Sequence, residues 1–587
     1  MHSKILKLQK EMKKNHMDGY ILPCTDEYLN EYVPNVKNRL KWLTNFTGSN
    51  GICFILRRKL LFFTDGRYIL QSKKELSEKF NIFDTSKINI FDWVTKNIKE
   101  KKFKISVDMK INSIFFIEKL IDVFKETNNK LILNKNNFID NIFNNIENKK
   151  SKNLFFLSER YSGEKATSKI KRIKEILKDY DLVIFTSPES IAWLLNIRGG
   201  DLEHTPLVFC RLLIKKNKLI LFINKKKINN GELKVFEDDL NIKVESEHLI
   251  GTEIKKSDEV KNIFINQNST FYFKYLAQKQ KRKITVGIDP CILEKSKKNE
   301  IEIKSAINMH ILDGVALVKF LCWLDLQTRN TILNEVIAAE KLKEFRMQNE
   351  NFISLSFPTI SAFGANGAII HYSANNKNKK KFRSGEIFLC DSGAQYLGAT
   401  TDVTRTIFYG NKNKILSIHK ETYTRVLKGH LKISKLIFPR KTKGYQIDAL
   451  ARESLWSVGY DYEHGTGHGV GSFLSVHEGP QSISKVLNNI PLLPGMILSN
   501  EPGFYLKDRF GIRIENLICV QESKLKNYLH FRTLTLAPYE LSLIDKKLLN
   551  RSEIDWLNNY HEKVFRKLKN HLNYDEQKWL KKKTSKI

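Results

Sequence analysis

The sequence predicts a mixed α/β protein with more than one domain. Its 587 residues exceed what one hydrophobic core usually organises. Strand-like apolar runs alternate with helical patterns over roughly the first half of the chain, which is typical of α/β units. From Lys304 a long helical pattern opens a third segment, in which strand-like runs carry acidic residues. We therefore expect domains over 1–155, 156–303 and 304–587.

The first segment contains a clear pair of strands followed by a helix. Apolar runs at 52–56 and 60–64 predict two strands joined by a basic turn at 57–59. The sequence Thr64-Asp-Gly-Arg-Tyr68 is then expected to lead into a helix. The Asn- and Lys-rich stretch 126–152 indicates surface loops at a domain edge.

The second segment has a similar size and style. It begins near Tyr161, with a helix predicted over 169–177 and a strand over 182–186. Further strands are predicted at 218–223 and 284–289. The sequences of the two segments are too different to establish an internal repeat by themselves.

The net charge of +35 raises nucleic acid as a partner, but its distribution argues against one. Lys accompanies Asn and Ile along the whole chain, whereas a nucleic-acid groove gathers cations and interleaves them with aromatic rings. We interpret the excess as solvated faces and loops.

The cysteines and the apolar runs indicate a reducing, cytoplasmic location without a membrane span. Seven widely spaced cysteines include no Cys-x-x-Cys and mostly lie in apolar runs, so we expect buried free thiols. We recognise no signal peptide and no apolar run long enough to cross a bilayer.

Five residues of metal-binding type lie in apolar or glycine-rich surroundings in the third segment. They are Asp391, Asp402, His468, Glu501 and Glu515. Four carboxylates and one imidazole suit two divalent cations such as Mn, Co, Fe or Zn better than a thiolate-type zinc site.

The two aspartates are predicted on one hairpin. Residues 386–395 and 399–409 are expected to form adjacent strands around a tight turn, which would hold Asp391 and Asp402 rigidly together. A lone Asp is more often a turn or cap residue. Both of these lie inside β-branched, apolar runs, where an unpaired buried carboxylate is costly. Strand alternation directs Cys390 to the opposite face, so we do not assign it as a ligand.

The histidine lies in His464-Gly-Thr-Gly-His468-Gly-Val-Gly471. The spacing does not give the dinucleotide fingerprint, and residue 465 is Gly where a zincin helix has Glu. Glycines around a ligand histidine let the backbone approach a metal and a bound peptide closely. Further along, Arg513 and Glu515 are expected on one face of a strand, with the arginine orienting the glutamate.

The order Asp, Asp, His, Glu, Glu and its surroundings resemble the pita-bread metallopeptidases. Similar motifs lie at 21–23, 64–68, 191–199 and 555–561, so the resemblance covers essentially the whole chain and extends to the long, three-domain form of aminopeptidase P. It implies two creatinase-like α/β domains followed by a pita-bread catalytic domain. It also implies a homodimer.

The resemblance implies a role for each residue. Asp391 would chelate one metal, His468 and Glu501 the other, and Asp402 and Glu515 would bridge the pair. The two metals, with Mn first and Co or Zn as alternatives, would hold and acidify a bridging water, and Glu501 would shuttle protons.

Other residues match positions of the family's active site that are not metal ligands. His371 and His477 match its catalytic, substrate-contacting histidines. His464 and Arg67 are expected to contact the substrate, Arg67 because it lies in a motif implicated in substrate contact in the long form.

The function that follows is hydrolysis of the bond before proline at position two of a peptide. Proline lacks an N–H and alters the backbone, so such bonds need a dedicated pocket. Within the same fold, the alternatives are a prolidase acting on X-Pro dipeptides, a methionine aminopeptidase and a creatinase. A further alternative is a metal-free pita-bread module binding histones or RNA. All five ligand positions are filled, which disfavours the binding module.

Overall fold

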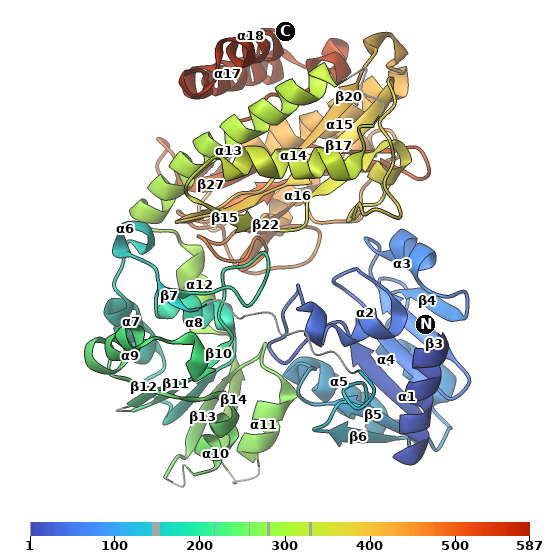
Figure 1. The fold of residues 1–587 in the computed structure, drawn as a ribbon, viewed down its shortest axis with the longest axis vertical. Coiled ribbons are helices and arrows are strands. Elements are labelled where there is room, and N and C mark those ends of the chain that lie inside the picture. The colour runs from blue at the N-terminus through green and yellow to red at the C-terminus, as the bar shows by residue number, and fades with distance from the viewer. Residues whose placement is uncertain (1, 144–152, 217, 257–258, 279–281, 328–331) are drawn as a thin grey trace. The chain divides into compact units, whose positions relative to one another are not determined.

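The computed structural model describes residues 2–143, 153–216, 218–256, 259–278, 282–327 and 332–587 (Figure 1). The chain forms two compact units, which we describe separately. Unit 1 comprises Met1–Ser158 and Glu164–Ile292, and unit 2 comprises Glu159–Gly163 and Leu293–Ile587. The boundaries expected at 155/156 and 303/304 remain predictions.

Unit 1 contains two six-stranded sheets with the same topology. The first has the order β4-β3-β2-β1-β5-β6 and the second β12-β11-β10-β8-β13-β14. In each, the earliest strand is central, the next three follow on one side, and the last two lie on the other. Each pair of neighbouring strands in the first sheet also has the same relative direction, parallel or antiparallel, as the equivalent pair in the second sheet. The strands are β1 Gly19–Pro23, β2 Ile52–Leu56, β3 Leu60–Thr64, β4 Phe80–Asp84, β5 Lys104–Asp108, β6 Lys130–Asn134, β8 Leu182–Phe185, β10 Cys210–Lys215, β11 Lys218–Ile223, β12 Ile242–Ser246, β13 Asn262–Asn266 and β14 Lys283–Gly287.

The first sheet is apolar on both faces because helices cover both. Tyr20 and Leu22 pack in one core cluster with residues of α1 (His2–Lys14) and α2 (Arg39–Thr44). Ile21 packs in another, with residues of α4 (Ile90–Ile98) and α5 (Ile114–Lys125). Strands covered on both sides have continuous apolar sequences, as seen here.

Two helices predicted in unit 1 are present with shifted bounds, and one region predicted as loops is in part a strand. The predicted helix after the Thr64 motif is α3, Ile69–Glu75, and that at 169–177 is α7, Ala166–Ile176. Part of the stretch expected as loops forms β6, and residues 144–152 of it lie outside the described residues. The remaining elements are β7 Phe155–Phe156, α8 Pro188–Leu194, β9 Ile197–Arg198, α9 Asn230–Lys234, α10 Ile250–Lys255 and α11 Phe271–Gln278.

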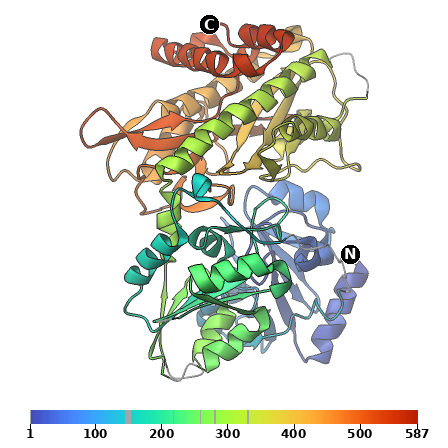
Figure 2. The same ribbon diagram turned by 60° about the vertical axis from the view of Figure 1, so that its left-hand side comes forward.

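The described strands of unit 2 form four sheets, which are β16-β17-β20, β15-β18-β19, β21-β28-β27-β24-β22-β23 and β25-β26. One core cluster joins β17 and β20 to α13, α15 and α17. Helices α17 and α18 both contact α13, beside which they are drawn in Figure 2. The helices of this unit are α6 Glu159–Ser162, α13 Glu300–Leu326, α14 Glu335–Met347, α15 Ser417–Ser434, α16 Gly444–Trp456, α17 Arg551–Leu568 and α18 Tyr574–Lys583, and α12 (Pro290–Ser296) crosses from unit 1. The strands are β15 Phe352–Leu355, β16 Ile360–Phe363, β17 Glu386–Ser392, β18 Ala394–Tyr396, β19 Ala399–Thr400, β20 Val403–Tyr409, β21 Ile437–Pro439, β22 Gly467–Gly469, β23 Glu478–Ile483, β24 Ile497–Asn500, β25 Gly503–Leu506, β26 Phe510–Arg513, β27 Asn516–Glu522 and β28 Tyr528–Thr533.

Helix α13 corrects two expectations. It begins four residues earlier than Lys304, because Asn299 caps it and exchanges hydrogen bonds with Glu302 in a capping box. Its 27 residues also reach the length and hydropathy of a membrane span, contrary to our expectation that no run does so. Of its most apolar window 56% is buried in the structure, and Asp313 on it accepts a buried bond from Arg346, as in a core helix.

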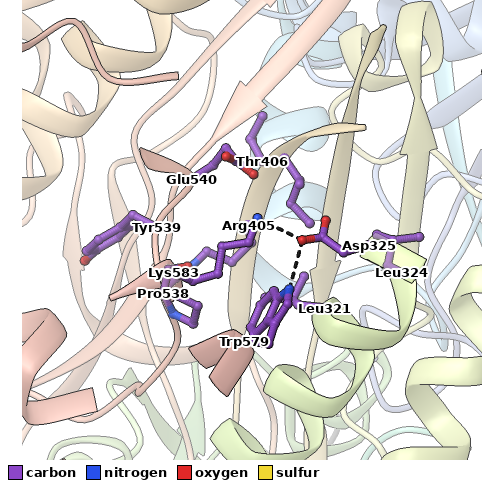
Figure 3. Close-up of a pocket in the computed structure, with 11 residues that line it drawn as sticks. Leu321, Leu324, Asp325, Arg405, Thr406, Pro538, Tyr539, Glu540, Trp579 and Lys583 are labelled. Carbon is purple, nitrogen blue, oxygen red and sulfur yellow. Dashed lines mark hydrogen bonds and ion pairs between the residues drawn. The ribbon is translucent and has the colours of Figure 1, made fainter. Parts of the chain in front are cut away.

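The C-terminal helix is attached to α13 by a polar contact. Trp579 Nε1 and Lys583 Nζ lie 2.8 and 2.9 Å from Asp325 Oδ2, beside a cavity of about 20 Å³ (Figure 3). A space of that size holds roughly one water molecule, so it is too small to be a ligand site.

The predicted hairpin is present, with an interruption at Gly393. Strand β17 pairs with β20 and sets Asp391 opposite Thr404, while β18 and β19 continue the hairpin to its turn. A Cβ at position 393 would lie 2.0 Å from the carbonyl oxygen of Thr401. Only glycine therefore allows the two backbone segments of the hairpin to approach this closely. Cys390 packs in the apolar core, as expected, and all seven cysteines are free.

Candidate metal centre

Three of the predicted ligands converge in unit 2. Ligand atoms of Asp402, His468 and Glu515 all lie within 4.8 Å of one another. Asp402 lies between β19 and β20, His468 lies on β22, and Glu515 lies between β26 and β27. His468 Nε2 is 3.6 Å from Asp402 Oδ2 and 3.4 Å from Glu501 Oε1, which brings Glu501 to the same point.

Asp391 faces the same group of charges with one oxygen engaged. Its Oδ2 accepts a hydrogen bond of 2.7 Å from Arg513 Nη2. Its Oδ1 is buried and has no hydrogen-bond partner among the described residues. A buried carboxylate oxygen is rarely left unsatisfied, so this atom fits a metal ligand.

The carboxylates of the cluster repel one another in a buried place. Burial raises the pKa of Asp402 well above its usual range, and Glu515 and Asp391 add to the rise. Burial, followed by Glu501 and Asp391, likewise raises the pKa of Glu515. The pKa of Glu501 is raised to about 7, chiefly by burial, with Arg513 opposing and Asp391 adding to the shift. Such crowded acids are what divalent cations neutralise, so the donor set fits a pair of metals.

The imidazole of His468 is oriented for ligation. Its Nδ1 is 3.0 Å from the carbonyl oxygen of Gly469, which favours a proton there and leaves the Nε2 lone pair toward the carboxylates. Its backbone N–H donates to Ser499 Oγ, which donates to Glu501 Oε1 at 3.1 Å. A Cβ at position 467 would lie 2.0 Å from the carbonyl oxygen of Ser499, which explains one glycine of the motif.

Arg513 reaches Glu515 only through Thr404, to whose Oγ1 its Nε donates at 3.3 Å. Strand β26 ends at Arg513, so Glu515 does not continue the same strand face. The guanidinium instead binds Asp391 and the hydroxyl of Tyr505, the latter at 2.7 Å. Glu515 is held by Thr404, whose Oγ1 donates to Oε2 at 2.8 Å.

The histidines that are not predicted ligands border the cluster. The ring of His477 stands perpendicular to that of His468 at 4.4 Å between centroids. His464 Nε2 lies 2.8 Å from Tyr505 Oη, and burial, with Arg513 next, lowers the pKa of His464 well below its usual range. The charge of His371 also lowers the pKa of His464, so the two histidines interact electrostatically.

Arg67 belongs to unit 1, where it pairs with Asp65 at 2.8 Å and lies over the ring of Tyr68. Its contact with a substrate remains a prediction.

Three hydroxyl residues of the site were not predicted. Tyr505 joins Arg513 to His464, Thr404 holds Glu515, and Ser499 links His468 to Glu501. Thr404 and Ser499 each lie two residues from a ligand in the chain, so strand alternation could have indicated them. Tyr505 has no comparable signal.

Family models match nearly the whole chain. The creatinase/prolidase N-terminal domain matches residues 4–134, and a second model of that description matches 145–302. Metallopeptidase family M24 matches 308–522, and the C-terminal region of peptidase M24 matches 527–587.

Full-length relatives agree with this organisation. Xaa-Pro aminopeptidase 1 of Dictyostelium discoideum is 36% identical over 96% of this chain and 92% of its own length. Aminopeptidase P1 of Arabidopsis thaliana is 32% identical over 100% of this chain and 99% of its own. The crystal structure of an X-prolyl aminopeptidase from Caenorhabditis elegans, described as cytosolic with a di-nuclear active site, superimposes with a TM-score of 0.95. It is 30% identical and covers 100% of this chain and 99% of that one. This chain therefore belongs to metallopeptidase family M24, in the long Xaa-Pro aminopeptidase form with two creatinase-type domains before the catalytic domain.

Proposed function

We infer that this chain releases the N-terminal residue from peptides whose second residue is proline, using the centre around Asp402, His468 and Glu515. The observation that carries the inference is the convergence of those three ligand atoms within 4.8 Å, bordered by Asp391 and Glu501. The full-length relatives named above support the substrate class.

We propose that Asp391 would hold one metal and that His468 and Glu501 would hold the other, with Asp402 and Glu515 shared between them. Two bound metals would acidify a water and polarise the scissile carbonyl. Mn is the first choice for a set of oxygen ligands with one nitrogen, with Co and Zn as alternatives.

Glu501 is suited to move the proton of the attacking water. Its Oε1 lies 3.4 Å from His468 Nε2, so the carboxylate is within reach of a water held at the centre. The hydroxyl of Ser499 donates to Oε1 and fixes the carboxylate's orientation.

The remaining residues act on the peptide. His371 and His477 contact the substrate around the scissile bond and stabilise the charge that develops on its oxygen. His464, whose Nε2 lies 2.8 Å from Tyr505 Oη and whose pKa burial and Arg513 lower, is a further substrate contact. We also propose that Arg67 contacts the substrate.

The test is reconstitution of the metal-free protein. Chelated protein is supplied separately with Mn, Co and Zn, and metal content is measured beside hydrolysis of Arg-Pro-Pro, with Arg-Ala-Ala as the matched control. We expect hydrolysis of the first peptide only, with two metals per chain and the highest rate in Mn. Protein that holds two metals and leaves Arg-Pro-Pro intact would contradict the function.

The dipeptide Arg-Pro separates this activity from that of a prolidase. A prolidase would cleave it faster than Arg-Pro-Pro, whereas we expect the reverse order. We also propose that the chain forms a homodimer, which light scattering of the purified chain checks. We propose a cytoplasmic location for it.

A further inference from the structure

One buried carboxylate accepts hydrogen bonds from both ends of a loop and from two side chains within it. Glu335 is 0% exposed at the first residue of α14. Its Oε1 accepts from the backbone N–H of Phe363 at 2.7 Å, and its Oε2 from that of Lys380 at 2.8 Å. The amide of Asn366 donates to both oxygens, and Tyr372 Oη donates to Oε2 at 2.8 Å. Phe363 and Lys380 flank the loop, which comprises residues 364–379. The side chain of Glu335 therefore connects the two ends of this loop.

The interior of this loop is fixed by the same group. The amide of Asn366 also donates to Tyr372 Oη at 2.9 Å, and that hydroxyl lies 3.0 Å from the carbonyl oxygen of Asn378. Tyr372 is 6% exposed, so these bonds form away from water. Hydrogen bonds to an ionised acceptor are about twice as strong as neutral ones.

The loop carries His371, the residue directly before Tyr372. The carbonyl oxygen of Ile370 lies 3.5 Å from Arg513 Nη2, the nitrogen that also donates to Asp391. The histidine therefore lies between two anchors, a buried carboxylate on one side and the arginine of the metal centre on the other.

The loop packs closely against β26 at one point. A Cβ at Gly367 would lie 3.0 Å from the backbone nitrogen of Gly511, and one at Gly511 would lie 1.8 Å from the carbonyl oxygen of Gly367. Backbone thus packs on backbone between the loop and β26, the strand that ends at Arg513. Loops of this length are usually among the more mobile parts of a protein, so the anchors set the position of the histidine.

We propose that Glu335, acting through Tyr372, is a positioning residue that holds His371 against the metal centre. The proposal rests on the role in turnover given above to His371. Neither Glu335 nor Tyr372 needs to touch substrate, because the effect passes through the adjacent backbone.

A double-mutant cycle tests this. The variants are Tyr372→Phe, His371→Ala and their combination, each assayed on Arg-Pro-Pro with its metals bound. A misplacement of about 1 Å can cost about 10²-fold in rate, so the smaller shift from one lost hydrogen bond should lower kcat about 10-fold. In the His371→Ala background the same change should cost less than about twofold, because the group it positions is gone. Metal content should stay at two per chain in all variants.

Tyr409→Phe is the matched control. Its hydroxyl donates to the carbonyl oxygen of Gln327, outside the loop, at 2.6 Å. Its ring contacts Phe363 and Phe382, and phenylalanine keeps that ring, so the variant loses only a tyrosine hydrogen bond outside the loop and kcat should not change. Glu335→Gln provides a second variant: it should lower kcat more than Tyr372→Phe does, and that loss should also shrink in the His371→Ala background.

The outcomes separate the two claims. Additive losses, or an unchanged kcat in Tyr372→Phe, would overturn the positioning role while leaving the function of His371 intact. Full turnover in His371→Ala would remove the role of that histidine and this proposal with it.

Discussion

Glu478 and Asp402 are both carboxylates buried in unit 2, but their surroundings are opposite. The side chain of Glu478 is 1% exposed and faces two buried ammonium groups, Lys295 at 2.7 Å and Lys298. Burial raises its pKa, but the two lysines outweigh burial and the net pKa is lowered. Asp402 faces Glu515 and other acids, and its pKa is raised well above the usual range.

The difference shows that burial alone does not identify a functional carboxylate. Around Glu478 the chain supplies its own cations, and the group is a closed structural cluster. Around Asp402 the chain supplies more acids than Arg513 can balance, so the missing positive charge must come from outside. We expect three experiments to separate the two regions.

The largest effect is expected on removing a charge from the acid cluster. Asp402→Asn and Glu515→Gln should each lose metal and activity together. Because metals supply several kcal/mol of transition-state stabilisation, kcat/KM should fall by at least about 10³-fold. In the absence of metal these variants should unfold at a higher temperature than the metal-free parent, since a repulsion has been removed. Metal analysis, peptide hydrolysis and thermal unfolding measure the three results, and full turnover in either variant would contradict the bridging assignment.

Removing the charge from the closed cluster should have the opposite effect on stability. Glu478→Gln leaves two buried ammonium groups without a countercharge, which should destabilise unit 2 by about 3–5 kcal/mol. The control is Glu522→Gln, because Glu522 pairs with Arg440 at the surface and should cost less than about 1 kcal/mol. Urea unfolding compares the two, and equal midpoints would show that the cluster is not structural.

The smallest effect is a pH dependence of the metal-free protein. The folded-state pKa of Glu501 is about 7, above that of an unfolded glutamate, so the folded state binds the proton more tightly. Its contribution to stability is therefore complete below about pH 4 and is lost as pH rises toward 7. Metal-free protein should melt at a lower temperature at pH 8 than at pH 5. Saturating Mn should raise the melting temperature more at pH 8 than at pH 5, and a metal-free protein that is more stable at pH 8 would contradict the raised pKa.

Local patterns predicted the strands of the metal hairpin and the residues that converge on it. Asp391 and Asp402 lie on a hairpin whose strands were predicted from their apolar, β-branched runs. The sequence also contained the capping pair of Asn299 and Glu302, which would have placed the start of α13 correctly.

The partners of charged side chains could not be predicted in the same way. Arg513 lies two residues from Glu515 in the chain, but it binds Asp391, 122 residues away, because β26 ends and the chain turns. The shared topology of the two sheets in unit 1 could not be read from sequence patterns either, although the family resemblance implied two creatinase-like domains. The topology resides in the order of strands, such as β5 returning beside β1, and pairings between distant strands leave no local periodic signal.

The cluster around Glu478 decides where the catalytic unit could be separated from the rest. Lys295 and Lys298 precede Lys304, so a fragment starting at the boundary expected from the sequence would lack both partners of a buried acid next to His477. It would also lack the Asn299 cap, whose amide binds the carbonyl oxygen of Ser162. A recombinant peptidase fragment must therefore start no later than Leu293, and it should include the short piece Glu159–Gly163, supplied as a second peptide or joined by a linker.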